Sequence, residues 1–341
     1  MWDVLLLACL VADPTVCETA RRPGGDSYNA CVVAAERMRL SDDWTKEAWP
    51  CVPAGETPAL ALTEIAPGVL VHKARHALMA AENGGDIANM AAVIGEEAVA
   101  VIDAGATAAI AERFLEALRT HTDLPVRWLI LTHMHPDHVL GAPVFAEAGA
   151  TVAAHANLAR GLAARARSYL ATGARALGDG MDGAGVVMPE IEVADRRVID
   201  LGGRSLLLEA HPVAHTDNDL TVTDDATEVM FLGDLAFLGH LPTLDGSLPG
   251  WLDLLDALAE RHASRVVLGH GPVAAPWPEA AGPTRDYLDG LAEAARAAIA
   301  AGAPTLEATR AIAAAAPEGW AMRDAFAERN ATAAIRELEW E

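Results

Sequence analysis

Short apolar segments recur along most of the chain after residue 60, and polar turns separate them. Runs such as AVAVID, RWLILT and VMFLGD consist almost entirely of apolar residues, which is typical of strands that are covered on both faces. We therefore expect strands at 60–65, 69–74, 91–94, 98–102, 127–132, 151–154, 205–210, 220–223, 228–232 and 265–268.

Helical spacing interrupts and follows these strands. In the segment 106–121, Ile110, Phe114 and Leu118 recur every four residues and share one face of a helix. The same character predicts helices at 156–177, 250–262, 283–301 and 321–339. Two groups of strands with helices between and after them indicate a layered α/β domain, with two sheets face to face and helices outside.

The first 57 residues differ from this pattern and end in the proline-rich stretch WPCVPAGETP, which indicates a linker. We expect a small module at 1–57 and a catalytic domain at 58–341. The apolar start MWDVLLLACLVA lacks the basic residues of a signal peptide, so we expect it to form a strand.

The four cysteines are Cys9, Cys17, Cys31 and Cys51, and none lies in the remaining 290 residues. An even number within one small segment predicts a disulfide-bonded module in an oxidising compartment. The alternative is four free thiols in a cytoplasmic protein. The cysteines indicate a periplasmic location, whereas the N-terminus shows no convincing export signal.

Composition excludes several classes of protein. Hydrophobic residues make up 52% and charged residues 21% of the chain, which argues against disorder. The formal net charge of −23 argues against a protein that binds nucleic acid or an anionic membrane surface. No apolar run reaches the roughly 18 residues of a membrane span. We expect a small-molecule substrate, no nucleic acid and no membrane insertion.

The segment LTHMHPDH at 131–138 directly follows a predicted strand. His133 and His135 lie two residues apart, so extended chain points both side chains the same way. The chain then turns, and Asp137 and His138 project to a neighbouring position. Imidazole and carboxylate are good ligands for zinc and similar ions. One ion cannot easily take four ligands from so short a stretch, so the spacing predicts two adjacent metals.

Further ligands of the same kind follow other predicted strands. Asp234 comes just after a buried strand in FLGDLAF, and His270 does the same in VVLGHG. The segment HPVAHTDNDLTV offers His211 and His215. These strand ends would converge on one rim of the sheets, where catalytic sites are commonly built.

In these motifs the chain resembles the metallo-β-lactamase fold superfamily, over about residues 60–300. More narrowly, ENGGDIANMAAVIGEEAVAVIDAG, THMHPDHVLGA, AHTDNDLTV, FLGDLAFLGHLPTLDGSLPGWL and GHGP resemble the quinoprotein relay system zinc metallohydrolases. The resemblance implies a four-layer αββα sandwich. It also implies metal ligands in two sets, His133, His135 and His215 in one and Asp137, His138 and His270 in the other, with Asp234 as the bridge between them. Asp137 and Asp234 are the implied catalytic residues.

Three further residues are candidates around this centre. His240 follows the implied bridge by six residues and could line the substrate pocket. Asp103 in VIDAG resembles a family position that orients the ligand loop by hydrogen bonds, although a turn-forming aspartate before glycine explains it equally well. For His211 we favour a role outside the ligand set.

We therefore expect a dinuclear zinc hydrolase that uses a metal-bound hydroxide on an ester, thioester or similar bond, with iron or manganese as other metals. The resemblance connects it with periplasmic quinoprotein or sulfur oxidation, and so with a periplasmic redox partner. One alternative is an oxidoreductase similar to the persulfide dioxygenases, which use a single iron. Another is a non-catalytic partner protein that the metal only stabilises.

Overall fold

The computed structural model describes residues 2–10, 17–25, 28–37, 44–48, 51–53 and 60–340. Its contacts divide the chain into two units, Met1–Ala59 and Leu60–Glu341. Among the described residues, no helix combines the length and the apolar character that a membrane crossing requires.

The first unit contains a sheet in which β1 (Trp2–Leu10) pairs antiparallel with β2 (Cys17–Gly25), β3 (Trp44–Ala48) and β4 (Cys51–Pro53). The helix α1 (Tyr28–Arg37) follows β2. The apolar N-terminus thus forms a strand, as its sequence predicts. The register sets the backbone of Cys9 opposite that of Cys17. The cysteine side chains lie outside the described part of the chain, so the disulfide prediction stays a prediction.

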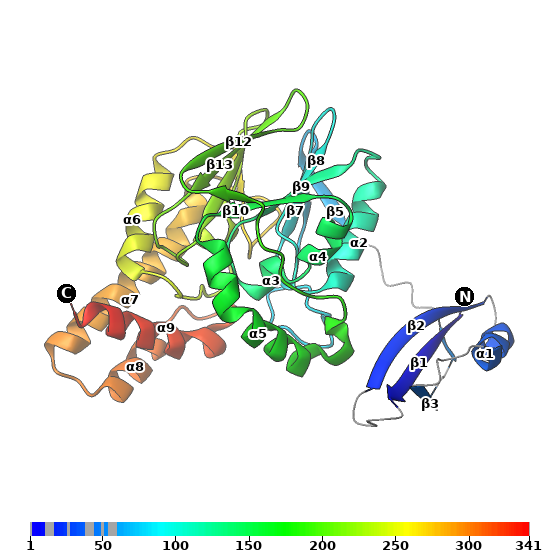
Figure 1. The fold of residues 1–341 in the computed structure, drawn as a ribbon. Helices are drawn as coiled ribbons and strands as arrows, with labels where there is room; N and C mark the ends of the chain where they lie inside the picture. The colour runs from blue at the N-terminus through cyan, green and yellow to red at the C-terminus, as the bar shows by residue number, and fades with distance from the viewer. Residues whose placement is uncertain are drawn as a thin grey trace. The chain divides into compact units, whose positions relative to one another are not determined.

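The second unit is built on two sheets (Figure 1). The first has the order β11-β10-β9-β8-β7-β6-β5 and the second the order β12-β13-β14-β15-β16. The strands of the first sheet are β5 (Leu62–Ala66), β6 (Val69–His72), β7 (Met90–Ile94), β8 (Val99–Ile102), β9 (Val126–Leu131), β10 (Thr151–His155) and β11 (Ile191–Val193). Those of the second are β12 (Arg196–Asp200), β13 (Ser205–Ala210), β14 (Leu220–Asp224), β15 (Val229–Phe231) and β16 (Arg265–Val267).

Alternation along the strands explains why both faces of the first sheet are apolar. In β8, Ala100 and Ile102 belong to the core between the two sheets. Val99 and Val101 point the other way, into a core shared with helices. All four side chains are at most 3% exposed. The continuous apolar run in the sequence is therefore the signature of a sheet that is covered on both sides.

Helices cover the outer faces of both sheets. Residues of α2 (Ala108–Arg119), α4 (Ala142–Glu147) and α5 (Leu158–Leu177) share the core of the first sheet. The second sheet shares its outer core with α6 (Leu248–Ala259), α7 (Gly282–Ala300), α8 (Thr305–Ala314) and α9 (Arg323–Leu338). The four layers αββα confirm the predicted fold class.

The hydrophobic pattern of the sequence did not predict several elements of the fold. The strand β12 has only one buried residue, Ile199, because it lies at the edge of its sheet. The helices α3 (Pro136–Val139) and α4 are too short to show a helical period, and α8 lies in an alanine-rich stretch with weak contrast between its faces. The strand β11 is only three residues long.

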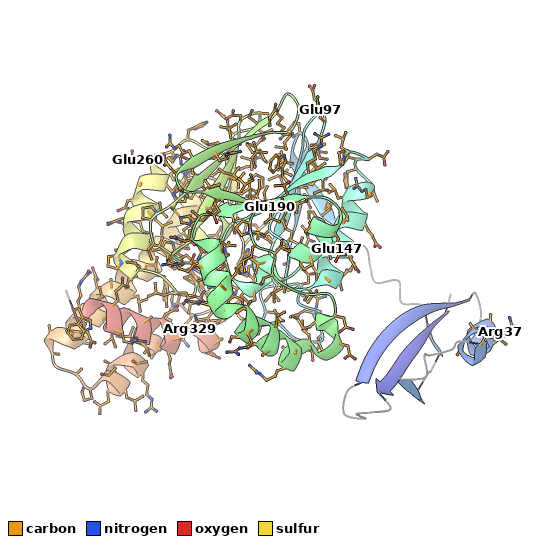
Figure 2. All side chains as sticks on the ribbon, viewed as in Figure 1. Arg37, Glu97, Glu147, Glu190, Glu260 and Arg329 are labelled. Atoms are coloured by element: carbon orange, nitrogen blue, oxygen red, sulfur yellow. The ribbon has the colours of Figure 1, made fainter. Side chains whose placement is uncertain are left out.

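Acidic side chains lie over the surface of the second unit. The exposed glutamates Glu97, Glu147, Glu190 and Glu260 come from four different segments and point outward (Figure 2). The strongly negative net charge is thus spread around the domain. Any attraction for an anion must therefore be local.

Candidate metal centre

Seven histidine and aspartate side chains gather where four segments meet. One group consists of His133, His135, His215 and Asp234, and a second of Asp137, His138 and His270. Within each group the potential ligand atoms lie within 4.8 Å of one another. The structure thus brings together all seven residues that the sequence resemblance assigns as ligands, with Asp234 grouped with the first three histidines.

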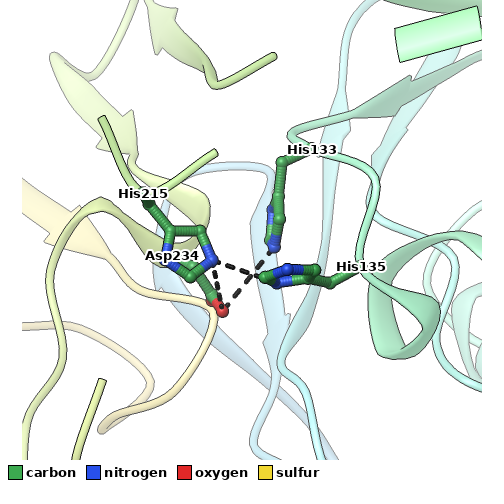
Figure 3. Close-up of side chains that lie close together, drawn as sticks. All are labelled: His133, His135, His215 and Asp234. Carbon is green, nitrogen blue, oxygen red and sulfur yellow. Dashed lines mark hydrogen bonds and ion pairs between the residues drawn. The ribbon is translucent and has the colours of Figure 1, made fainter. Parts of the chain in front are cut away.

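The first group is centred on three imidazoles (Figure 3). His135 Nδ1 lies 3.0 Å from His215 Nε2. The carboxylate oxygen Oδ2 of Asp234 lies 3.7 Å from His133 Nε2 and 3.6 Å from His215 Nε2. These nitrogens come from the end of β9 and from the loop between β13 and β14, so the two sheets meet at this point.

The second group faces the same aspartate from the other side. His270 Nε2 lies 3.4 Å from Asp234 Oδ2 and 3.3 Å from Asp137 Oδ2. His138 Nε2 lies 3.4 Å from Asp234 Oδ1. Asp234 therefore offers both of its oxygens to the two groups and occupies the position of a bridge.

Hydrogen bonding leaves metal-facing nitrogens free. His133 Nε2 and His138 Nε2 are buried and have no hydrogen-bond partner among the described residues. The opposite ring nitrogens are occupied, because His133 Nδ1 lies 3.1 Å from Thr132 Oγ1 and His138 Nδ1 lies 2.8 Å from Asp103 Oδ2. Leaving buried polar atoms without partners is costly. A cation held by these nitrogens would satisfy them, so the residues fit a metal centre.

Burial keeps two ligands of the first group neutral. It lowers the pKa of His215 to about 3, with a further contribution from the neighbouring His135. The pKa of His133 is also lowered well below its ordinary value, by burial and by the adjacent His138. Neutral imidazole is the form that binds metal. This side of the centre is therefore ready to bind a cation without first losing a proton.

Carboxylates have the opposite effect on the second group. Burial alone would lower the pKa of His270, but Asp234 and Asp137 raise it to about 9. The pKa of His138 is raised well above its ordinary value against the same burial, by Asp234 and Asp103. A metal that binds here takes the place of these protons, so binding releases protons at neutral pH.

Asp103 holds the ligand-bearing loop from behind. Its carboxylate accepts hydrogen bonds from the Thr132 backbone amide at 2.8 Å and from the Thr132 hydroxyl at 2.9 Å. It also accepts the Nδ1 proton of His138. Asp103 has a positive φ of 61°, an unfavourable conformation that places it after β8 facing the end of β9. Both interpretations from the sequence describe this residue, because it forms a turn and also orients the ligand-bearing loop by hydrogen bonds.

Asp245 supports His135 in the same way, and the sequence analysis missed it. His135 Nε2 donates to Asp245 Oδ2 at 3.1 Å, which leaves Nδ1 free to face His215. Arg165 of α5 donates to the same carboxylate oxygen. Asp245 is 110 residues from His135 in sequence, and the signal that could have identified it is its place in TLDGS, within a segment that resembles the family.

A glycine lets the backbone approach the bridge. A Cβ added at Gly269 would lie 2.1 Å from Asp234 Oδ1 and 2.7 Å from His138 Cε1. Asn89 anchors this loop, because its backbone amide donates to the Gly269 carbonyl at 2.8 Å and its side chain donates to Leu268. Asn89 thus secures the segment that carries His270.

The other two candidate histidines lie in different surroundings. His240 stacks on His270 with ring centroids 4.7 Å apart and lines the cavity above the metal ligands. His211 points away from the ligand set, and its Nε2 lies 2.8 Å from Thr221 Oγ1. The structure therefore places His240 at the cavity and His211 outside the centre.

Comparison with known proteins gives the same fold. The family described as the metallo-beta-lactamase superfamily matches residues 83–270. A metallo-beta-lactamase from Pontibacter korlensis is 21% identical with a TM-score of 0.55, over 67% of this chain and 99% of its own. The metallo-beta-lactamase FIM-1 from Pseudomonas aeruginosa, in a mono-zinc form, is 20% identical with a TM-score of 0.51, over 67% and 95%.

A larger protein is also similar. The stereoselective inverting sec-alkylsulfatase Pisa1 from Pseudomonas sp. is 18% identical with a TM-score of 0.62 over 83% of this chain, which spans about half (51%) of the sulfatase chain. At such identities the likeness concerns the fold. No curated protein matches the chain in sequence. The family match covers more than half of the 341 residues and contains every residue of the seven-ligand cluster, so the chain belongs to the metallo-beta-lactamase superfamily.

Proposed function

We propose that this protein is a metal-dependent hydrolase that holds two adjacent metal ions, preferably zinc, and cleaves an ester, thioester or similar bond in a small molecule. One observation carries the proposal. Two ligand sets share the carboxylate of Asp234 at the floor of a cavity of about 510 Å³. A cavity of this size suits a small-molecule substrate.

A pair of divalent metals bound here would lower the pKa of water and polarise the bond under attack. The chain supplies the remaining functions. His133 and His215 offer neutral donors, and Asp234 offers Oδ2 to both ligand sets and Oδ1 to His138. Asp137 borders the cavity beside His270, where its carboxylate can accept a hydrogen bond from a water that enters.

Water is the nucleophile that the chain favours. All four cysteines lie in the first 51 residues, so the catalytic unit has no cysteine to attack a substrate or to bind a metal. The ligand set instead contains only imidazoles and carboxylates, which suit zinc and harder cations. The absence of a cysteine ligand argues against lactam hydrolysis, for which several enzymes of this fold use one.

Metal content and turnover test the proposal together. Protein purified without added chelator should contain about two zinc ions per chain by mass spectrometry of the metals. It should hydrolyse at least one member of a panel of 4-nitrophenyl esters and acyl thioesters, and lactams in the same panel should stay intact. Chelation should abolish this activity, and added zinc should restore it.

The other outcomes identify the alternatives. One iron per chain with oxygen uptake on a persulfide would establish the oxidoreductase similar to the persulfide dioxygenases. Two metals with no turnover of any panel member would favour a partner protein that metal only stabilises.

We propose further that the protein works in the periplasm beside a quinoprotein or sulfur oxidation system. The resemblance of its motifs to the quinoprotein relay system hydrolases and its cluster of four cysteines support this. Thiol titration of the unfolded, unreduced protein from its native cells should find no free thiol. Four free thiols would contradict both the disulfides and the location.

A further inference from the structure

The cavity above the metal ligands has walls of two different characters. Its floor includes Asp137, Asp234 and His270. Apolar side chains line one part of it, among them Leu78, Met79, Ile87, Phe237 and Phe326. The rest of the lining carries two arginines and several hydroxyl groups. A substrate that fills it must therefore offer both an apolar body and a polar group.

The two arginines share a single carboxylate. Arg165 of α5 donates to Asp245 Oδ2, the oxygen that also accepts from His135. Arg329 of α9, labelled in Figure 2, holds its Nη2 3.8 Å from Asp245 Oδ1, beyond hydrogen-bond distance. Within this wall the two guanidiniums of Arg165 and Arg329 face the single carboxylate of Asp245, so the wall has one positive charge in excess.

A hydroxyl group completes this wall. The Tyr169 hydroxyl is buried beside the guanidinium of Arg165. It lines the same cavity, one helical turn beyond Arg165 on α5. A guanidinium has no acceptor atom, so the hydroxyl can only accept from Arg165, and its own proton stays available to a ligand that accepts it. Arg329 and Tyr169 thus offer donors from two helices to one region of the cavity.

We infer that this cavity recognises a small, singly charged oxyanion, a carboxylate or sulfonate group, through Arg329, Arg165 and Tyr169, while the apolar wall holds the body of the same molecule. The inference rests on the proposed function in placing the bond to be cleaved over the metal ligands. It adds the class of substrate: a monoanion with an apolar body.

The charge of the whole chain sharpens this selection. A net charge of −23 repels anions at long range, and the repulsion grows with the number of charges on the ligand. The one guanidinium in excess in this wall can pair with one negative charge, which favours a monoanion over a polyanion. Guanidinium also suits the planar, paired oxygens of a carboxylate. Polyanions should therefore bind weakly.

Binding of stable probes tests the inference independently of turnover. We would titrate the zinc-loaded protein calorimetrically with 4-phenylbutyrate, with 3-phenylpropane-1-sulfonate and with neutral 4-phenylbutyramide. At least one anion should bind ten times more tightly than the amide or better, as expected for a charged hydrogen bond in a partly buried site. The tighter of the two anions identifies the natural head group.

Variants locate the anion. Arg329→Gln should weaken binding of the preferred anion about ten- to a hundredfold and change binding of the amide less than twofold. Arg329→Lys, which keeps the charge, should recover part of the loss. Arg336→Gln is the matched control, because Arg336 is an exposed arginine of the same helix that does not line the cavity. It should bind the anion as the unaltered protein does.

Two results would overturn the inference. One is equal affinity for the anions and the amide. The other is anion binding that disappears on chelation yet is unchanged in Arg329→Gln, because the metals alone would then hold the anion. Failure of the proposed function has a different signature: Arg329-dependent binding of the anion with no hydrolysis of anionic or neutral 4-nitrophenyl esters would leave a binding pocket without the enzyme.

Discussion

His138 and His135 are held by the same device in two different surroundings. Each donates one ring proton to an aspartate and turns its other nitrogen toward the ligand cluster. The pair of His138 and Asp103 is sealed, with side chains 0% and 4% exposed. The pair of His135 and Asp245 borders the cavity, at 12% and 16%.

The partners of the two aspartates differ as well. Asp103 accepts hydrogen bonds from Thr132, the residue directly before His133, and from His138. Neither partner lines the cavity. Asp245 is bonded to Arg165 and faces Arg329, which both line the cavity. The first pair can only position a ligand. The second pair also connects a ligand to the groups that meet a substrate.

We expect the largest effect at Asp234, because its carboxylate contacts both ligand sets. Asp234→Asn nearly keeps the shape of the side chain but removes the charge that offsets two cations. We expect the variant to fold, to bind fewer than two metals, and to lose turnover on the order of a thousandfold. Metal analysis after dialysis and kcat/KM on the best panel substrate measure these effects. Two tightly held metals with near-normal turnover would show that Asp234 is not the bridge.

Removing the carboxylate of the sealed pair should have the next largest effect. In Asp103→Asn, the acceptor for Thr132 and His138 is weakened inside the fold, where water cannot replace it. Metal affinity should fall about ten- to a hundredfold, and the free energy of unfolding should fall by roughly 1–3 kcal/mol. Competition with a fluorescent chelator and urea unfolding measure the two losses. Loss of metal affinity without loss of stability would mean that the hydrogen bonds of Asp103 do not stabilise the fold.

Asp245→Asn should show how the pair of His135 and Asp245, which borders the cavity, differs from the buried pair of His138 and Asp103. Metal affinity should fall about tenfold, at the lower end of such effects, because water can reach His135 in its place. Stability should change little. The larger change should appear in KM, since Arg165 loses its fixed partner at the cavity. If Asp245→Asn lowered stability as much as Asp103→Asn, the two pairs would not differ in kind.

The contrast also explains which parts of the site the sequence could predict. His133, His135, Asp137 and His138 lie in one short segment, so their spacing alone carries the geometry. The layers could be predicted too, because strands such as β8 are apolar on both faces. The cavity could not, since Arg165, Asp245 and Arg329 come from three distant segments. An isolated arginine on an amphipathic helix has the pattern of any exposed residue until packing places it at a cavity.

The buried carboxylate of Asp224, at the end of β14, should affect turnover least, because it lies at neither ligand pair. It accepts hydrogen bonds from Arg204 Nε at 2.8 Å and Nη2 at 2.6 Å, and from Thr227. Burial alone would raise its pKa, but these bonds lower it below the ordinary value of 3.8. A carboxyl group whose pKa is lower in the folded state stabilises the fold above its unfolded pKa, and loses that effect as pH falls through the folded pKa.

Asp224→Asn should therefore change the acid side of the stability curve and little else. In chelator-treated protein, urea unfolding between pH 5 and pH 2 should show a shallower loss of stability with falling pH than the unaltered chain shows. Metal content and kcat/KM at neutral pH should stay within about twofold. Asp225→Asn is the matched control, because Asp225 is the exposed neighbour on the same turn and should leave the acid slope unchanged. Equal slopes for all three proteins would mean that the Arg204 pair does not hold Asp224 ionised. A loss of metal from Asp224→Asn would mean that support for the ligands extends through the second sheet, well beyond Asp103 and Asp245.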